Sequence, residues 1–240
     1  MTAKKITSWS FSRYGDYKQC PLKCKLKHID KIVEPRGAAL LRGEAIHSLA
    51  EKYIRGAINR MPTELKLFAG MFKELKAKFR KQPSRMVVED NWAFTKNWDE
   101  TQWNNWAECW VRLKLDCAVH EDDVTLRIRD WKTGKFRVEQ NEEYVEQLEL
   151  YALAALLIGE HLERVIPELV YLDQGVVYPE VGSELIFTRA DIPKLKKLWV
   201  KRTKPMLSDT VFAPKANSNC RWCWFGQSKK SDGGPGLCKF

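Results

Sequence analysis

The order of helical and strand-like segments constrains the fold of this chain more than any other feature of its sequence. Apolar residues at helical spacing predict helices over residues 12–20, 37–58, 63–81, 141–159 and 190–207. Strand-like segments occur at residues 85–96, 109–119, 123–133, 167–175 and 184–188. Helices followed by a β-meander, and then by helix, strand, strand and helix, predict an α/β fold with a mixed central β-sheet flanked by helices.

Length and charge limit the classes of function. A chain of 240 residues suits one large α/β domain or two small ones, and we expect a single domain over 1–240. The formal net charge of +10 favours a polyanionic partner, either nucleic acid or an anionic membrane surface. No apolar run reaches the roughly 18–20 residues that span a bilayer, and the first residues do not resemble a signal peptide. We therefore expect a soluble, cytoplasmic protein.

The strand that ends in "IRDWKTGK", residues 128–135, carries two charges on its apolar face. Residues two apart in a strand share a face, so Asp130 and Lys132 lie on the same side as Leu126 and Ile128. Buried charges are costly unless they are paired or bind a metal ion. The pair is therefore either an ion pair at a sheet edge or half of a metal site, and this strand alone leaves both open.

A second carboxylate, Asp116, ends the preceding strand "WVRLKLD". Two neighbouring carboxylates repel each other unless a cation lies between them, and such oxygen ligands suit Mg²⁺ or Mn²⁺. Simple alternation, however, places Asp116 on the face opposite Leu113 and Leu115. A bulge or bend is needed to bring its carboxylate to the side of Asp130.

Four motifs then occur in the order typical of one family. They are Gly43-x-x-x-His47, Asp116, Asp130-x-Lys132 and Gln147-x-x-x-Tyr151. Together they resemble the PD-(D/E)XK nuclease superfamily, specifically its RecB-like branch, which includes the CRISPR-associated exonucleases. The resemblance runs from "SFSRYGDYKQCP" at residues 10–21 to the last cysteines and implies a restriction-endonuclease-like core. Asp130 stands where the family motif permits Asp or Glu.

This resemblance implies a role for each of the residues in the motifs. His47, Asp116 and Asp130 would hold a divalent metal ion, Mg²⁺ or Mn²⁺, with the Trp131 carbonyl as a further ligand. Lys132 would orient or help deprotonate the attacking water and stabilise charge at phosphorus, while Gln147 and Tyr151 would support the substrate strand or the lysine. Phosphodiester hydrolysis needs both a nucleophile and charge neutralisation, which such a set supplies.

The seven cysteines include a group near the C-terminus. Cys220 and Cys223 form a C-x₂-C pair, and Cys238 follows 15 residues later. By the resemblance, Cys20 of the Cys-Pro segment would be the fourth ligand of a [4Fe–4S] cluster. Such a cluster would join residues 1–36 to 208–240, around a nuclease core at 37–207. Cys24 competes with Cys20 as the ligand, and structural Zn²⁺ or no metal at all are the alternatives.

The implied substrate is DNA, with single strands or DNA ends favoured. Basic runs such as "KLKKLWVKRTK" suit a groove that follows phosphates, and some tryptophans could stack on unpaired bases. We expect an exonuclease of recombination, repair or phage DNA processing, with a helicase or recombination protein as an implied partner. No G-x-x-x-x-G-K-[ST] motor motif is present. The alternative is an endonuclease or a non-catalytic DNA-binding module of a larger complex.

Overall fold

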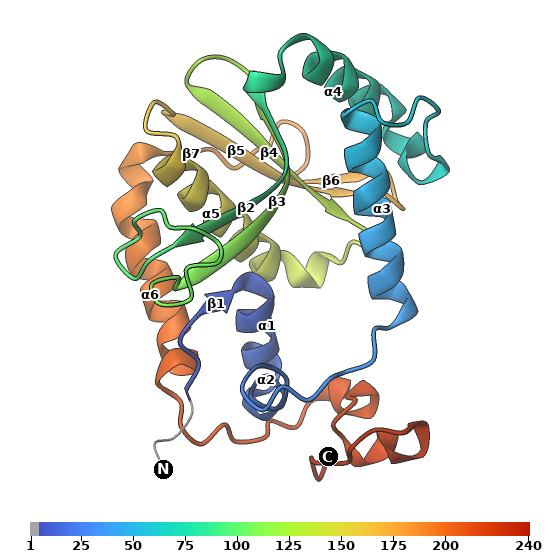
Figure 1. Ribbon diagram of the computed structural model, residues 1–240, viewed down its shortest axis with the longest axis vertical. Coiled ribbons are helices and arrows are strands. Elements are labelled where there is room, and N and C mark those ends of the chain that lie inside the picture. Colours follow the sequence, from blue (N-terminus) through green and yellow to red (C-terminus); the bar gives the residue numbers. More distant parts are fainter. Residues whose placement is uncertain (1–4) are drawn as a thin grey trace.

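A seven-stranded mixed sheet organises the fold in the computed structural model, which describes residues 5–240 (Figure 1). Its strands are β1 Trp9–Ser10, β2 Met86–Phe94, β3 Val111–His120, β4 Thr125–Lys132, β5 Arg164–Tyr171, β6 Val176–Tyr178 and β7 Phe187–Thr188. The α-helices are α1 Phe11–Gln19, α2 Pro21–His28, α3 Ala38–Ile54, α4 Ala69–Lys81, α5 Asn141–Ile158 and α6 Ile192–Ser208. The predicted mixed sheet flanked by helices is confirmed.

Strand β3 is the centre of the sheet because it pairs with three neighbours. It is antiparallel to β2 along most of its length, antiparallel to β4 only from Cys117 to His120, and parallel to β1 at its start. Strands β4 and β5 pair in parallel over their full lengths. Parallel neighbours need a crossover connection, which α5 supplies. Strands β6 and β7 then pair antiparallel with β5.

The helices cover the sheet in two layers (Figure 1). Helices α5 and α6 pack on one face, where Trp199 and Leu153 join a large apolar cluster with β2, β3 and β4. Helices α3 and α4 pack on the other face, around Phe72 and Trp131. Helix α5 lies between the sheet and α6, and for this reason its residues 150–156 are all buried and apolar.

The N-terminal segment contains two elements that sequence periodicity did not predict. Strand β1 is only two residues long, and it is held by pairing with β3 and by the stacking of Trp9 on Trp199 at 5.2 Å. Helix α2 begins at Pro21, directly after the helix that we predicted over residues 12–20. Proline is well tolerated in the first turn of a helix because its missing N–H would have no partner there.

The C-terminal segment returns to the same end of the molecule as α1 and α2 (Figure 1). Beyond α6 the chain holds two short 3₁₀ helices, Ser218–Trp222 and Gln227–Asp232. The Asn217 side chain donates to the Gln19 carbonyl over 3.0 Å, which links the two ends of the chain.

The remaining differences from prediction lie at the ends of elements. The helix predicted over 63–81 begins as a 3₁₀ helix, Thr63–Phe68, before α4, and β5 starts three residues earlier than predicted. Within residues 5–240, no helix combines the length and apolar character needed to cross a bilayer.

Candidate active site

The site forms where β3 separates from β4. The two strands pair up to Cys117 opposite Arg129, and at the start of β3 the strand β1 pairs with Val111 and Arg112 instead, while β2 pairs with β3 along most of its length. Side chains satisfy the backbone groups in the resulting gap. The Trp131 N–H donates to Asp116 Oδ2 over 2.7 Å, and the Tyr151 hydroxyl lies 3.0 Å from the Lys114 carbonyl. The carboxylate of Asp116 therefore replaces a ladder hydrogen bond at the point of separation.

The expected bend in β3 occurs at Asp116. Leu115 and Ala118 belong to the apolar cluster on the face covered by α5 and α6, whereas Cys117 belongs to the cluster on the face covered by α3 and α4. Residues 115 and 117 would share a face in a regular strand, so the alternation shifts by one residue at Asp116. Glu89 lies opposite in β2, with a backbone φ of 50°. This positive φ is uncommon outside glycine and marks a local break in the strand. Both carboxylates thus leave the regular pattern at the same level of the sheet.

Three ligand-type side chains meet at this break. His47 Nδ1 lies within hydrogen-bonding distance of Asp116 Oδ1, at 3.0 Å, and lies 3.9 Å from Glu89 Oε1. One ligand atom from each of the three residues lies within 4.8 Å of the other two. His47 comes from α3, where Gly43 allows a close approach: a Cβ at Gly43 would lie 3.2 Å from the Thr133 hydroxyl.

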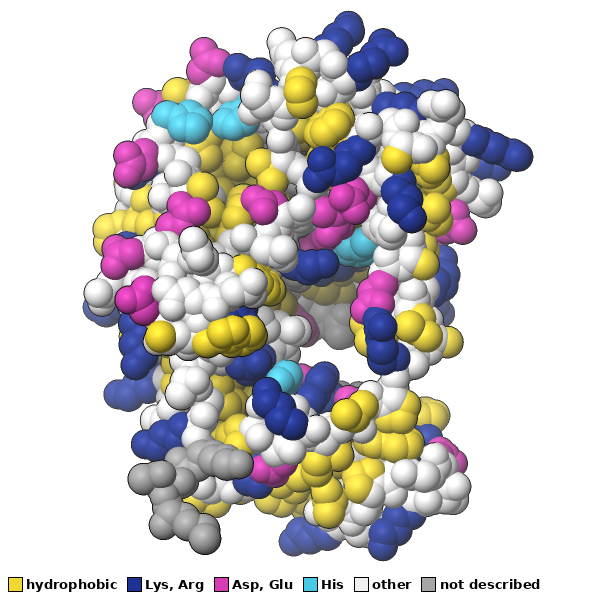
Figure 2. Space-filling view, viewed as in Figure 1, with side chains coloured by type: hydrophobic (Ala, Val, Ile, Leu, Met, Phe, Trp, Pro, Cys, Tyr) yellow, Lys and Arg dark blue, Asp and Glu magenta, His cyan; other side chains and the backbone are white. Residues whose placement is uncertain are grey.

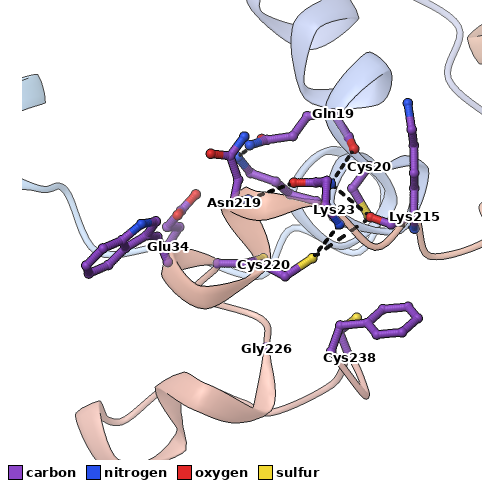
Figure 3. A pocket seen from close by; sticks show the side chains of 13 residues that line it. Gln19, Cys20, Lys23, Glu34, Lys215, Asn219, Cys220, Gly226 and Cys238 are labelled. Carbon is purple, nitrogen blue, oxygen red and sulfur yellow. Dashed lines mark hydrogen bonds between the residues drawn. The ribbon is translucent and has the colours of Figure 1, made fainter.

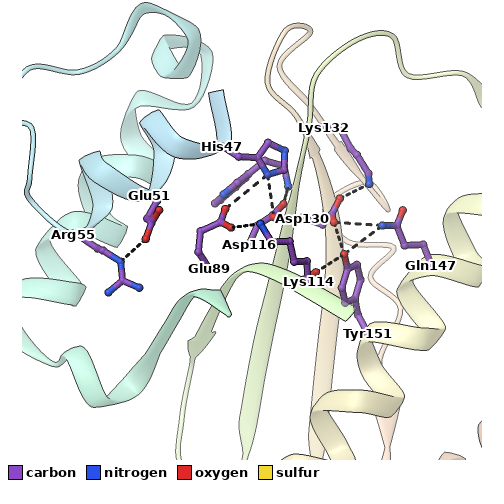
Figure 4. A network of polar contacts seen from close by, with 11 residues as sticks. His47, Glu51, Arg55, Glu89, Lys114, Asp116, Asp130, Lys132, Gln147 and Tyr151 are labelled. Atoms are coloured by element: carbon purple, nitrogen blue, oxygen red, sulfur yellow. Dashed lines mark hydrogen bonds and ion pairs between the residues drawn. The ribbon is translucent and has the colours of Figure 1, made fainter. Parts of the chain in front are cut away.

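A second group lies beside the first and contains the remaining motif residues (Figure 4). Lys132 Nζ lies 2.5 Å from Asp130 Oδ2, and the Tyr151 hydroxyl lies 2.6 Å from Asp130 Oδ1. Gln147 Nε2 reaches both Asp130 Oδ1 and the Tyr151 hydroxyl at 3.4 Å. Because Gln147 and Tyr151 are four residues apart on α5, they project from one face of that helix.

The electrostatics of the site favour a bound cation. Burial raises the pKa of Asp116, and the charge of Asp130 raises it further. Burial also raises the pKa of Glu89, with Asp116 as the next cause. Burial alone would lower the pKa of His47, but its hydrogen bond to Asp116 and the surrounding carboxylates reverse the sign. Glu89 Oε1 and Asp130 Oδ2 are buried without a well-aligned hydrogen-bond donor among residues 5–240. A donor set of carboxylates and one imidazole fits Mg²⁺ or Mn²⁺.

The structure brings all the predicted motif residues to one region, in two groups rather than one. His47 lies with Asp116, while Asp130 lies with Lys132, Gln147 and Tyr151. The Trp131 side chain packs against Phe72, with the two ring centroids 4.9 Å apart. This contact fixes the backbone between Asp130 and Lys132.

Glu89 joins the first group although no motif predicts it. Its position follows from the register of β2, where Val88 lies opposite Cys117 and Asp90 opposite Leu115. This register puts Glu89 level with Asp116. The register depends on how β2 pairs with β3, which the sequence alone does not give.

The four predicted cysteine ligands line one pocket between α1, α2 and the C-terminal segment (Figure 3). The pocket has a volume of about 170 Å³ and contains Cys20, Cys220, Cys223 and Cys238. Backbone N–H groups point at two of the sulfurs, from Lys215 to Cys20 at 3.5 Å and from Asn217 to Cys220 at 3.3 Å. Among residues 5–240, no three of the sulfurs lie within 4.8 Å of one another.

The competing residue Cys24 does not line this pocket. It is fully buried, its thiol lies 3.7 Å from the Arg13 carbonyl, and burial raises its pKa to about 12. Cys24 therefore lies apart from the four cysteines that share the pocket.

Comparison with known proteins places the chain in a family. Residues 8–228 match the family model of the PD-(D/E)XK nuclease superfamily. No curated protein matches the chain. The crystal structure of SSO0001 is 16% identical with a TM-score of 0.44, covering 92% of this chain and 85% of that one. The structure of a candidate exonuclease from Eubacterium rectale is 14% identical with a TM-score of 0.47, covering 90% and 87%.

At these identities and TM-scores the two structures carry no argument about activity. The family match is different, because it spans both groups of the site and nearly the whole length of the sequence. This chain belongs to the PD-(D/E)XK nuclease superfamily.

Proposed function

We propose that the protein is a metal-dependent deoxyribonuclease that hydrolyses phosphodiester bonds at DNA ends or in single strands. The observation that carries the proposal is the buried pair Asp116 and Asp130 beside Lys132, at the point where β3 and β4 separate. Both carboxylates are 5% exposed. Two neighbouring buried carboxylates are costly even when each has a partner, as Asp116 has in His47 and Asp130 in Lys132, and a functional requirement explains why they are kept.

Asp116 and Asp130, together with His47, would hold the divalent ion, with Glu89 and the Trp131 carbonyl as further oxygen donors. A bound Mg²⁺ or Mn²⁺ would neutralise charge on the phosphate and lower the pKa of the attacking water. The predicted ligand set of His47, Asp116, Asp130 and Trp131 remains a proposal, to which we add Glu89 because of its position.

Lys132 would act on the reacting groups directly. Its Nζ contacts one oxygen of Asp130, and its flexible chain lets the ammonium orient a water molecule or stabilise the phosphorane. Tyr151 and Gln147 would hold the other Asp130 oxygen in place. Their part would be to position Asp130, which would help to hold the metal ion.

The finer assignment is a RecB-like exonuclease. The motif order supports it, and the net charge of +10 suits a DNA partner. Figure 2 shows a hollow in the middle of the molecule with lysine and arginine side chains on its rim. Basic side chains in this position could contact successive phosphates of a bound DNA strand. A helicase or recombination protein would be a further partner. The alternatives are an endonuclease and a non-catalytic DNA-binding module. The complete set of Asp116, Asp130 and Lys132 argues against the non-catalytic module, and the DNA substrates compared below distinguish an endonuclease from an exonuclease.

The experiment is degradation of single-stranded, linear duplex and circular DNA by the purified protein in Mn²⁺. We expect loss of linear and single-stranded DNA, with circular duplex DNA spared. Asp130→Ala should abolish the activity, whereas Asp123→Ala should not, because Asp123 is exposed in the β3–β4 turn. Metal-dependent cleavage by Asp130→Ala would refute the assignment, and cleavage of circular duplex would favour an endonuclease.

We further propose that Cys20, Cys220, Cys223 and Cys238 hold a [4Fe–4S] cluster. Four thiolates around Zn²⁺ at about 2.3 Å lie roughly 3.8 Å apart, whereas among residues 5–240 no three of these sulfurs lie within 4.8 Å of one another. An iron–sulfur cluster supports wider spacing because each thiolate binds a different iron atom. Protein purified without oxygen should absorb broadly at about 400 nm and contain iron, and Cys220→Ser should lose both. Stoichiometric zinc without iron would establish the alternative.

A further inference from the structure

A cavity of about 630 Å³ adjoins the proposed active site on the side of the N-terminal segment. Lys132, Gln147 and Tyr151 line it together with Arg13 and Arg112. Neither arginine has a part in the catalytic arrangement described above. The volume lies within the range of sites that enclose small organic ligands, and it connects these arginines with the residues proposed to act on the phosphodiester.

The charges that line this cavity favour an anion. Four of its residues are cationic, Arg13, Arg112, Lys114 and Lys132, whereas one, Glu143, is a carboxylate. A concave surface dominated by one sign of charge concentrates its field and attracts the opposite charge.

Arg112 is fixed in place but keeps unused donors. Its guanidinium lies 3.9 Å from the ring centroid of Trp106 and 5.3 Å from that of Trp103, and its Nε donates to Cys109 Sγ over 3.1 Å. Its buried Nη2 has no acceptor among residues 5–240. Trp106 is 73% exposed, so packing alone does not explain why it stands against Arg112. These contacts orient the guanidinium at the wall of the cavity.

Arg13, from α1, is the second guanidinium. Its Nη1 donates to the Ser8 hydroxyl over 3.1 Å, and its buried Nε lacks an acceptor within residues 5–240. The nearby carboxylate of Asp16 is occupied by Lys23, Lys27 and His28. Burial lowers the pKa of Arg13, and the charge of Arg112 acts in the same direction. Both arginines are partly buried, and each keeps one buried nitrogen without an acceptor among residues 5–240, a cost that an anion bound in the cavity would reduce.

We propose that Arg13 and Arg112 form a phosphate subsite, which binds a backbone phosphate next to the phosphodiester held at Asp130 and Lys132. Guanidinium groups match phosphate oxygens in a forked geometry, which lysine cannot reproduce. Trp103 lines the same cavity and offers an aromatic face to an unpaired base, so the subsite selects a single-stranded segment. The subsite rests on the proposed nuclease function and extends it to the recognition of the strand.

The test measures binding in Ca²⁺, which is expected to occupy the metal site without supporting cleavage. Fluorescence anisotropy of a labelled oligothymidylate is followed over a series of salt concentrations for the wild type, Arg13→Gln and Arg112→Gln. Each lost phosphate contact on a single strand should make the slope of log K against log [salt] less negative by about 0.7. Affinity should fall at least tenfold at low salt. Arg60→Gln is the control, because Arg60 is exposed outside this cavity and carries the same charge.

Wild-type slopes and affinities in both Arg13→Gln and Arg112→Gln would overturn the subsite. Circular dichroism checks that each variant folds; if Arg112→Gln does not, Arg13→Gln decides alone. Arg112→Lys keeps the charge without the fork, and we expect weaker binding with a nearly unchanged slope. If the wild type cleaves DNA in Mn²⁺ but the variants keep the wild-type salt slopes, the phosphate subsite is refuted and the nuclease function stands. Absence of cleavage with the expected slopes would refute the nuclease function and leave the subsite standing.

Discussion

Replacing Asp16 with asparagine removes the carboxylate that ties α1 to α2. Asp16 lies 2.9 Å from His28 Nε2, 3.1 Å from Lys27 Nζ and 3.3 Å from Lys23 Nζ, and its side chain is 12% exposed. Burial by itself would raise its pKa. The hydrogen bond from His28 and the charges of Lys23 and Lys27 outweigh burial and lower the pKa to about 2.

The size of the effect follows from this shift. The pKa falls from 3.8 to about 2, and at about 1.4 kcal/mol per unit the ionised carboxylate contributes about 2 kcal/mol to the free energy of unfolding. Because the pKa is lowered in the folded state, the contribution is complete above the unfolded value of 3.8. It is lost as the pH falls from about 4 towards 2. For a chain of this length, about 2 kcal/mol corresponds to a change in Tm of roughly 4–8 °C.

Thermal unfolding followed by circular dichroism between pH 7 and 2.5 measures this contribution. We expect Asp16→Asn to unfold several degrees below the wild type at pH 7, with the difference shrinking below about pH 4. Asp123→Asn, at an exposed ion pair with Arg85, should differ from the wild type by less than about 0.5 kcal/mol throughout. A difference for Asp16→Asn that is absent at pH 7, or that persists undiminished at pH 2.5, would refute the reasoning.

The remaining predictions concern the support of the active site. Phe72→Ala should lower the free energy of unfolding by about 3–5 kcal/mol in urea titrations, because Phe72 is fully buried against Trp131. Leu67→Ala, at a position 63% exposed, should change the free energy of unfolding little. A loss as large as that of Phe72→Ala would contradict the importance of this packing. Tyr151→Phe should lower kcat on DNA about tenfold at unchanged KM, because Asp130 loses its hydroxyl donor. A rise in KM alone would instead assign Tyr151 to substrate binding.

Much of the fold could be predicted from periodicity. The alternation in β4 identified the face shared by Leu126, Ile128 and Asp130, and the structure buries all three. Apolar spacing located α3, α5 and α6. These elements are long enough for the pattern to be read without knowledge of their partners.

The elements that escaped prediction depend on partners distant in sequence. Strand β1 exists because Trp9 and Ser10 pair with β3, and two residues carry no periodicity of their own. The direction of Asp116 depends on where β3 leaves β4, which is a property of pairing rather than of the strand. Glu89 enters the site for the same reason, through its register against β3.

The candidate site was predicted as a set of residues, but not in its arrangement. The resemblance implied that His47, Asp116 and Asp130 share one metal ion, which stays a prediction, whereas the contacts of Asp130 with Lys132 and Tyr151 come from the structure. Asp130 and Lys132 touch, a contact that an edge ion pair and a metal site share.

Separating metal binding from cleavage tests the central claim most directly. Mn²⁺ binding measured by isothermal titration calorimetry, and DNA degradation by the same samples, are compared for the wild type, Asp116→Asn and Lys132→Ala. We predict that the wild type binds and cleaves, and that Asp116→Asn does neither. Lys132→Ala should bind Mn²⁺ but cleave at least about a hundredfold more slowly. Cleavage at the wild-type rate by Asp116→Asn or by Lys132→Ala would contradict the account.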